Sequence, residues 1–284
     1  MSLNSVNTNI GATVALESLN ATNSQLQAAQ KQISTGFRVA DATDDGAAYA
    51  VAQRVRSDVS ALGSANQQLG NVQGLLSTTS SALNDVSNTM ASARDVLVKL
   101  ADGNTQGTQR AQYVAQYQTL VKQVSSFFQD ASYSGKTLIG NIGGATGFGS
   151  VATVRNEVGS TYGIATFSGS ALVASINFTS TQLNGAATVT ALIGTSSSAS
   201  FMNQLSSLGT AMATYGAATN YITNQVSYNS NKIDALNGGM GSLIDADLAQ
   251  ESAKLQSLQI RQQLGTQALS IANQAPTSLL SLFK

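Results

Sequence analysis

Two clusters of acidic residues in this sequence could bind a metal ion or carry out acid-base chemistry. The first, DATDDG, places Asp41, Asp44 and Asp45 just ahead of a glycine, as at the start of a calcium-binding loop. An EF-hand loop needs alternating oxygen ligands and a glutamate at its twelfth position, and the residue found there, counted from Asp41, is Ala52. The sequence therefore favours a structural role for this cluster over a calcium site.

The second cluster, DADLAQE, carries Asp245, Asp247 and Glu251 at the start of an expected helix. Acidic side chains at a helix N-terminus stabilise the helix by about 0.3–1 kcal/mol, because they face the positive end of its dipole. General acid-base catalysis is the alternative interpretation of the same spacing. We favour stabilisation of the helix.

The residue types that are missing exclude several classes of enzyme. The chain contains no histidine and no cysteine. Ser-His-Asp and Cys-His nucleophilic chemistry and the usual zinc sites therefore cannot be built. Carboxylate pairs, Ser-Lys pairs and oxygen-ligand metal sites remain open. We predict a protein that is not an enzyme and that uses no cofactor.

The balance of charge narrows the choice of partners. Charged residues make up 10% of the chain and the formal net charge is zero, whereas about 25% is usual for soluble proteins. Weak self-repulsion favours association. Without a basic excess, neither nucleic acid nor an anionic membrane is expected as a partner. Eight of the 28 charged residues nevertheless lie between positions 31 and 58, and this concentration needs an explanation.

The beginning of the chain does not resemble a cleavable signal peptide. The segment MSLNSVNTNIGATVALESLN has no positive charge and no apolar run of seven residues. No stretch approaches the roughly 18 apolar residues of a membrane-spanning helix. Export, if it occurs, is expected to proceed without a cleaved signal peptide.

The elements that must position these residues are long helices. Between residues 55 and 100 an apolar residue recurs every seven positions, with a second set interleaved at spacings of three and four. The same pattern recurs over residues 201–236 and, more briefly, over 114–131. These stripes predict a helical bundle with an apolar core. The first stripe consists of Val55, Leu62, Leu69, Leu76, Leu83, Met90 and Leu97.

Both chain ends carry weaker versions of the pattern. Asn23 and Gln30 interrupt the N-terminal stripe, and Gln262 and Gly265 interrupt the C-terminal one. Polar residues at such positions lower stability and select partners or register, so the ends are expected to be loose until something packs against them. Between residues 139 and 199, Gly separates short runs of Val, Ile, Thr and aromatic residues, which predicts a small β-rich insertion.

Three segments resemble one protein family. Residues 19–55, LNATNSQLQAAQKQISTGFRVADATDDGAAYAVAQRV, are similar to the N-terminal segment of bacterial flagellins. Residues 244–283, from IDADLAQES to SLLSLF, are similar to the C-terminal segment of the same family, and YSGKTLI at 133–139 resembles the turn that closes its N-terminal helical part. The resemblance departs at Gly46, where the family usually continues Ala-Ala-Gly after the paired acids.

The resemblance implies a mainly α-helical subunit of the flagellar filament. Both chain ends are expected to form a long antiparallel coiled coil, with a helical bundle beyond it and a small β-rich outer insertion. The implied domains are residues 1–40 with 242–284, residues 41–140 with 200–241, and residues 141–199. The residues expected to pack copies together in the inner core are Leu16, Leu19, Leu26, Ile33, Leu248, Leu255, Leu258 and Leu269.

The charged stretch is interpreted as the connector between the inner terminal helix and the long outer helix. We expect its charged side chains to pair across neighbouring copies in a partly desolvated joint, where breaking a pair on one side costs roughly 3–5 kcal/mol. The residues expected to act there are Arg38, Asp41, Asp44, Asp45 and Arg54.

The resemblance also implies partners and a location. The expected partners are other copies or sister flagellins, hook-filament junction and cap proteins, the flagellin export chaperone and the flagellar export apparatus, at an extracellular flagellum. Host Toll-like receptor 5 is an expected weak partner, because the family motif Leu-Gln-Arg-x-Arg-Glu-Leu is only partly present. The matching positions are Met90, Ala91, Ser92, Ala93, Arg94, Asp95 and Val96.

Other functions stay open at this point. A hook-filament junction protein or a cap protein could use similar chain ends. A surface adhesin or carbohydrate-binding subunit could use the uncharged middle, which has no Asp, Glu, Lys or Arg between Glu157 and Lys232. The short middle and the long N-terminal match favour the filament subunit.

Overall fold

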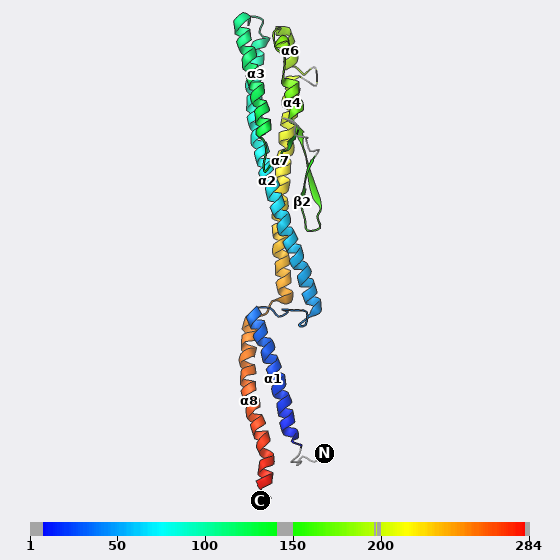
Figure 1. Ribbon diagram of the computed structural model, residues 1–284, viewed down its shortest axis with the longest axis vertical. Helices are drawn as coiled ribbons and strands as arrows, with labels where there is room; N and C mark the ends of the chain where they lie inside the picture. The colour runs from blue at the N-terminus through cyan, green and yellow to red at the C-terminus, as the bar shows by residue number, and fades with distance from the viewer. Residues whose placement is uncertain (1–7, 141–149, 196, 198–199, 282–284) are drawn as a thin grey trace. The chain divides into compact units, whose positions relative to one another are not determined.

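The computed structural model describes residues 8–140, 150–195, 197 and 200–281 of the chain. This part of the chain is mainly helical, with long helices at both ends and small strands between them (Figure 1). The long helices are α1 (Ile10–Thr35), α2 (Gly46–Ala101), α3 (Gly107–Asp130), α7 (Phe201–Ile244) and α8 (Leu248–Ser281).

The insertion between α3 and α7 is built from short elements. Its described strands and helices are β1 (Ile139–Gly140), β2 (Ser150–Val154), β3 (Thr161–Ala165), β4 (Phe167–Ser168), α4 (Gly169–Ile176), α5 (Ser180–Leu183) and α6 (Ala186–Ile193). Strands β2 and β3 pair as an antiparallel hairpin, with Val151 opposite Ile164. Strands β1 and β4 pair in parallel.

The chain divides into two compact units. The first, here called the terminal unit, consists of residues 1–58 and 234–284, and the second, here called the central unit, consists of residues 59–233. Among the described residues, no helix is long and apolar enough to cross a membrane.

The heptad stripe of α2 forms the core of the central unit. From Leu62 to Leu97, each stripe residue that the sequence predicted is fully buried. Tyr117 and Phe128 of α3 and Phe201, Leu208 and Tyr215 of α7 bury their side chains in the same core. Because burying one such side chain is worth about 1.5–3 kcal/mol, these stripes hold the three helices together, as the sequence predicted.

Buried polar residues fix the arrangement of the central unit. Asn229, fully buried on α7, donates a hydrogen bond to the Asn66 amide oxygen at 2.8 Å and another to the Arg155 carbonyl at 3.0 Å. Arg110 is buried and donates to carbonyl oxygens alone, including those of Leu100 and Leu183 at 2.8 Å. Its positive charge lies at the C-terminal end of α2, where the helix dipole favours a cation.

The insertion contains the expected small sheet, but it is less β-rich than the sequence predicted. Residues 169–193 form three short helices and not strands. Ser and Thr residues cap two of them: the Ser168 hydroxyl accepts from the Ala171 N–H at 3.3 Å, and Thr179 forms a capping box with Gln182. Short runs of Val, Ile and Thr are ambiguous by periodicity, and the capping residues decide for helix.

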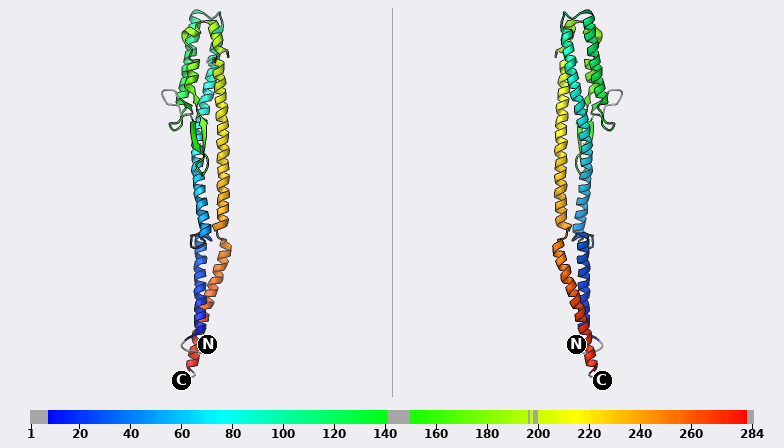
Figure 2. Two further views of the ribbon diagram at one scale, coloured as in Figure 1. Left: turned by 90° about the vertical axis from the view of Figure 1, so that its right-hand side faces the viewer. Right: turned by 90° about the vertical axis from the view of Figure 1, so that its left-hand side faces the viewer.

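The terminal unit is built around the antiparallel pair of α1 and α8, which lie side by side in Figures 1 and 2. The Gln262 amide on α8 donates to the Asn23 amide oxygen on α1 at 2.8 Å. Near the other end of α1, Asn9 donates to the Ala272 carbonyl at 2.7 Å. A Cβ at Gly265 would lie 3.2 Å from the side chain of Leu19, so this glycine lets the two helices approach closely. Asn23 and Gln262, which interrupt the two stripes, therefore meet each other.

Candidate functional site

The connector, residues 36–45, joins α1 to α2 and pairs with the short segment between α7 and α8. Gly36 ends α1 in the left-handed conformation with φ 74°, which suits glycine. The Arg38 and Val39 N–H groups donate to the Ile244 carbonyl at 2.7 and 3.2 Å, and the Ala246 N–H donates to the Gly36 carbonyl at 3.0 Å. These bonds lie where α1 ends and just before α8 begins.

A small apolar cluster supports this pairing. Val39, Ala52 and Ile244 are buried together, and Phe37 and Met240 are among the side chains that pack against them. The Arg56 guanidinium lies 5.7 Å from the centre of the Phe37 ring, at a distance typical of a cation–π contact. The cluster combines residues from the connector, from α2 and from the end of α7.

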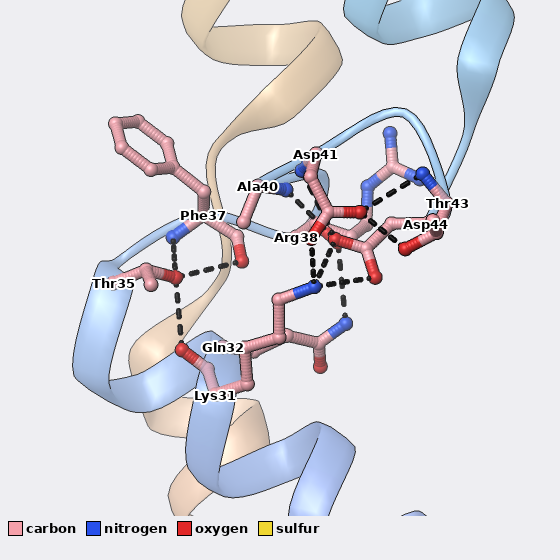
Figure 3. Close-up of polar contacts among 9 residues, drawn as sticks. All are labelled: Lys31, Gln32, Thr35, Phe37, Arg38, Ala40, Asp41, Thr43 and Asp44. Carbon is pink, nitrogen blue, oxygen red and sulfur yellow. Dashed lines mark hydrogen bonds and ion pairs between the residues drawn. The ribbon is translucent and has the colours of Figure 1, made fainter.

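Charged side chains of the connector meet at Lys31 (Figure 3). The Lys31 ammonium group donates to Asp41 Oδ2 at 2.7 Å and to both carboxylate oxygens of Asp44 at 2.9 Å. Asp44 also accepts from the Ala40 N–H at 3.0 Å, and Asp41 accepts from the Thr43 N–H and hydroxyl. The connector is therefore folded around one cation that belongs to α1.

The same contacts shift the titration of these groups. The hydrogen bond from Lys31 holds the pKa of Asp41 well below its usual range, and bonds from Thr43 add to the effect. Hydrogen bonds from Lys31 and from the Ala40 N–H lower the pKa of Asp44, and both carboxylates raise the pKa of Lys31. The cluster is half-exposed, so solvent screens it and each pair contributes little by itself.

Two further acidic residues of these clusters, Asp45 and Asp247, accept hydrogen bonds from backbone N–H groups, while Glu251 pairs with Lys254 at 3.2 Å. Asp45 Oδ1 accepts from the Ala47 and Ala48 N–H groups at 3.0 Å, at the start of α2. Asp247 Oδ1 accepts from the Ala249 and Gln250 N–H groups at 3.0 and 3.2 Å, at the start of α8. Asp247 therefore caps α8, as the helix-stabilisation interpretation predicts for this position. Within the described residues, no group of three acidic side chains could hold a metal ion.

The two arginines predicted for the connector differ in their contacts. Arg38 donates from Nη2 to the Leu243 carbonyl at 2.5 Å, which adds a side-chain link to the end of α7. Arg54 is exposed on α2, and its side chain makes no hydrogen bond or ion pair to another described residue. The prediction missed Lys31 as the centre of the cluster, although Lys31 lies in the same charged stretch, two residues before Ile33 of the terminal stripe.

The terminal helices show two kinds of apolar residue. Leu258 is buried and Leu19, Leu26 and Leu255 are partly buried. Ile33 and Leu269, at the expected spacing, are partly buried too. Leu16 and Leu248, by contrast, are 47% and 49% exposed. Further exposed apolar residues on α1 and α8 are Ile10, Val14, Ile260, Leu264 and Ile271.

Comparison with known proteins identifies the family. The model of the bacterial flagellin N-terminal helical region matches residues 6–143, and that of the C-terminal helical region matches residues 199–283. The chain belongs to the bacterial flagellin family. Flagellin FljK of Caulobacter vibrioides is 34% identical over 286 residues, covering all of both chains, and a flagellin of Brucella melitensis is 32% identical over 294 residues, covering 99% of each.

These relatives decide between the functions left open by the sequence. Flagellins are structural proteins, and this flagellin is a subunit of the bacterial flagellar filament, an extracellular polymer in which it assembles with other flagellin copies. A protein described as a flagellar hook-associated protein from Vibrio parahaemolyticus shares the fold, with a TM-score of 0.55 at 17% identity, and covers 71% of this chain and 100% of its own. That likeness concerns the fold alone.

The stretch that resembles the receptor motif lies on α2 of this flagellin. Met90 and Val96 are buried in the core of the central unit. Ala91, Ser92, Arg94 and Asp95 are exposed. The helix therefore uses one face of this stretch for its own core and presents the other face to solvent.

Proposed function

We propose that the terminal unit holds the filament together and that the exposed apolar residues of α1 and α8 are its contact surface with neighbouring copies. The observation that carries the proposal is the exposure of these residues, from 42% at Ile10 to 69% at Ile271, on a helix pair that buries few side chains of its own. Because burying one large apolar side chain is worth about 1.5–3 kcal/mol, copies that cover this surface gain much of their association energy there.

The layered arrangement of the filament is part of the same proposal. Residues 1–40 with 242–284 would form the inner layer, residues 41–140 with 200–241 the next layer, and residues 141–199 the outer surface. The seam residues Leu19, Leu26, Leu255 and Leu258 would hold α1 to α8, while Leu16 and Leu248 would pack against other copies. This division follows from the family resemblance and from the exposed apolar residues of the chain ends.

The connector is proposed to fix the end of the terminal helix pair. It ties α1, the start of α2 and the end of α7 to one another through Lys31, Arg38 and the bonds to Ile244. Asp41, Asp44 and Asp45 are proposed to hold the shape of this segment, and exposed Arg54 to meet a neighbouring copy. In this arrangement a change of charge alters the shape of the joint and, with it, the shape of the filament.

The test is to make two apolar residues of the contact surface polar. Ile260→Ser with Leu264→Ser, both 58% exposed in the single chain, should leave the monomer folded and prevent filaments from forming. Sedimentation and electron microscopy under assembly conditions measure the effect. Val98→Ser is the matched control, because Val98 is 54% exposed on α2 of the central unit. Normal filaments from the double variant would refute the proposed contact surface.

Export and assembly partners are proposed from the same surface. A flagellin export chaperone would cover the apolar face of the terminal helices before assembly, and the export apparatus, sister flagellins, hook-filament junction proteins and cap proteins would meet the chain afterwards. Export would proceed without a cleaved signal peptide. Intact mass of filament subunits tests this point: loss of an N-terminal segment from the 29.1 kDa chain would contradict it.

Weak recognition by Toll-like receptor 5 is proposed from the exposed face of the receptor stretch. Arg94 and Asp95 match the family motif there, whereas Ala91 and Ser92 replace its glutamine and first arginine. An interface arginine is worth about 2 kcal/mol or more, so we expect binding weaker by roughly 30-fold or more than that of a flagellin with the full motif. Ala91→Gln with Ser92→Arg should restore part of the signal in a cell reporter assay. Full signalling by the unaltered monomer would refute the proposal.

A further inference from the structure

A groove in the central unit lies beside the insertion hairpin. It has a volume of about 450 Å³ and is lined by α2 between Gln68 and Leu75, by the turn Tyr133–Lys136 and by Val151–Val154 of β2. A second cavity of about 230 Å³ shares Gln68 and Val154 with it and continues along the hairpin towards Glu157. We call the larger cavity the β2 groove.

The backbone of β2 opens into this groove. The Arg155 N–H donates to the Ser160 carbonyl across the hairpin at 2.8 Å. In an antiparallel pair, main-chain groups point alternately towards the partner strand and away from it. Thr153 and Val151 therefore bond to β3, while the N–H and C=O groups of Ala152 and Val154 point to the opposite edge. No hydrogen bond from another described residue reaches that edge of β2.

A buried hydroxyl adds an unused hydrogen-bonding group. Thr153 lines the β2 groove and is 5% exposed, and its Oγ1 has no hydrogen-bond partner. Buried hydroxyl groups are nearly always paired, because leaving one unpaired is costly. Gln68 and Asn71 on α2 bring further amide groups to the same lining. The groove therefore offers both main-chain and side-chain partners to a polar backbone.

The described residues that line the β2 groove carry positive charge and no negative charge. Lys136 is exposed and is the single charged residue among the described residues that line the β2 groove. Its position is fixed by a tight turn, in which Tyr133 and Lys136 exchange backbone hydrogen bonds at 2.8 and 3.0 Å. Ser134 and Gly135, the central residues, have φ angles of 49° and 73°, as in the turns that favour hairpins. A ligand that meets Lys136 gains most if it carries a carboxylate.

We propose that the β2 groove binds an extended acidic peptide segment of a partner protein, which adds to β2 as a third strand and places a carboxylate against Lys136. Strand addition of this kind takes its affinity from main-chain hydrogen bonds and its specificity from side-chain pockets. The edge of β2 to which no other described residue bonds supplies the main-chain hydrogen bonds, and Lys136 with the Thr153 hydroxyl supplies the side-chain contacts. The inference goes beyond filament assembly and does not depend on the terminal unit.

The probe for the test is a fluorescein-labelled pentapeptide with the sequence Thr-Val-Thr-Val-Glu, titrated against monomer and against filaments by fluorescence anisotropy. We expect saturable binding to both. A peptide that ends in Lys should bind at least about tenfold more weakly, because it loses the charge-assisted contact. The same peptide with N-methylated backbone amides should not bind. Equal binding of all three peptides, or no binding at millimolar concentration, would overturn the proposal.

Two variants separate the groove from the fold of the hairpin. Ala152→Pro removes an N–H that points into the groove and spares the bonds to β3, so it should abolish binding. Thr161→Pro is the matched control: Thr161 pairs with Val154 and its N–H points to the opposite edge of the hairpin, so binding should persist. Lys136→Gln should weaken binding about tenfold. Circular dichroism checks that each variant is folded, and unchanged affinity of a folded Ala152→Pro variant would contradict strand addition.

The last experiment compares the accessibility of the β2 groove in filaments and in the monomer. Because the chain contains no cysteine, Ala152→Cys introduces a single thiol at the exposed edge of β2. If the groove serves a separate partner, a maleimide reagent should label this thiol in filaments as fast as in monomer. A thiol that becomes protected on assembly, together with loss of peptide binding, would mean that another flagellin copy fills the groove, and would overturn the proposed partner.

Discussion

The apolar stripes of the central and terminal units follow the same heptad rule, yet they reach different degrees of burial. On α2 the stripe residues from Leu62 to Leu97 are fully buried, because α3, α7 and the insertion also cover this core. On α1 and α8 most of the stripe stays partly exposed, since two helices cannot enclose a core. The central unit therefore completes its core in one chain, while the terminal unit leaves apolar surface exposed, which we propose that other copies cover.

The largest effect is expected in the core of the central unit. Leu83→Ala removes a fully buried side chain and should lower the free energy of unfolding by about 2–5 kcal/mol. Denaturant unfolding of the monomer, followed by circular dichroism, measures the change. Val98→Ala, at a 54% exposed position of the same helix, should cost less than about 0.5 kcal/mol. Similar losses for the two variants would break the distinction between buried and exposed positions.

Proteolysis should expose the same difference between the units without any mutation. Local opening costs least where few apolar contacts hold the backbone, so a protease should trim about 30–50 residues from each end of the monomer, on the order of the length of one terminal helix. The central unit should survive as a fragment that no longer polymerises. Mass spectrometry of the products identifies the cut sites. Termini that resist cleavage in dilute monomer would show that the terminal unit is stable alone.

A smaller effect is expected in the seam of the terminal helix pair. Leu26 is only partly buried, so Leu26→Ala should cost the monomer about 1 kcal/mol, near the average for single substitutions. The filament should lose more, because every copy carries the defect. Thermal dissociation of filaments, compared with melting of the monomer, measures the two losses. An equal shift in both would argue that neighbouring copies do not help to order this seam.

The smallest effect is expected from mild acid at the connector. Because the folded chain lowers the pKa of Asp41 and Asp44 below the ordinary 3.8, their stabilising contribution is present above about pH 4 and is lost as the pH falls through the lowered values. Lys31, with its pKa raised above 10.5, stays charged throughout this range. Filament dissociation measured between pH 3 and 6 should become less dependent on pH in Asp44→Asn.

Asp95→Asn, at an exposed position of α2, is the control for this acid titration.

Charge reversal at the connector tests the same charged contacts more strongly. Asp44→Lys sets two cations side by side at the connector, and Arg38→Glu removes the bond to the Leu243 carbonyl. Either change should alter filament shape or block assembly. Filaments of unchanged helical form in both variants would refute the role of the connector.

Much of the fold could be predicted from the sequence, because heptad spacing reports burial directly. The first stripe of α2 was predicted residue by residue, the stripes of α3 and α7 were predicted as ranges, and the break between α1 and α2 was predicted from the charged stretch. The short helices of the insertion were missed, since eight residues rich in Val, Ala and Thr suit strand and helix alike. Their caps at Ser168 and Thr179 were the available signal.

The candidate site was predicted less completely than the fold. Asp41, Asp44 and Asp45 were found because charge is rare in this chain, but their partners could not be read from spacing. Lys31 lies ten positions before Asp41, and Leu243 and Ile244 lie about 200 positions beyond Arg38. Contacts of this kind depend on how α7 and α8 return to the connector, which no local pattern in the sequence encodes. The pairing expected between copies was found, for Lys31, within one chain.

The buried tyrosines of the central unit give the chain an optical signal of its own. The sequence has eight tyrosines and no tryptophan, and all of the tyrosines except Tyr49 lie between residues 59 and 233. Burial raises the pKa of Tyr215 to about 12 and raises that of Tyr117 further, while each hydroxyl donates to a backbone carbonyl. As the pH rises above about 10, where an unfolded tyrosine ionises, folding becomes less favourable. Ultraviolet absorbance during an alkaline titration should therefore report ionisation of the exposed tyrosines first. Tyr117 and Tyr215 should ionise only when the central unit unfolds.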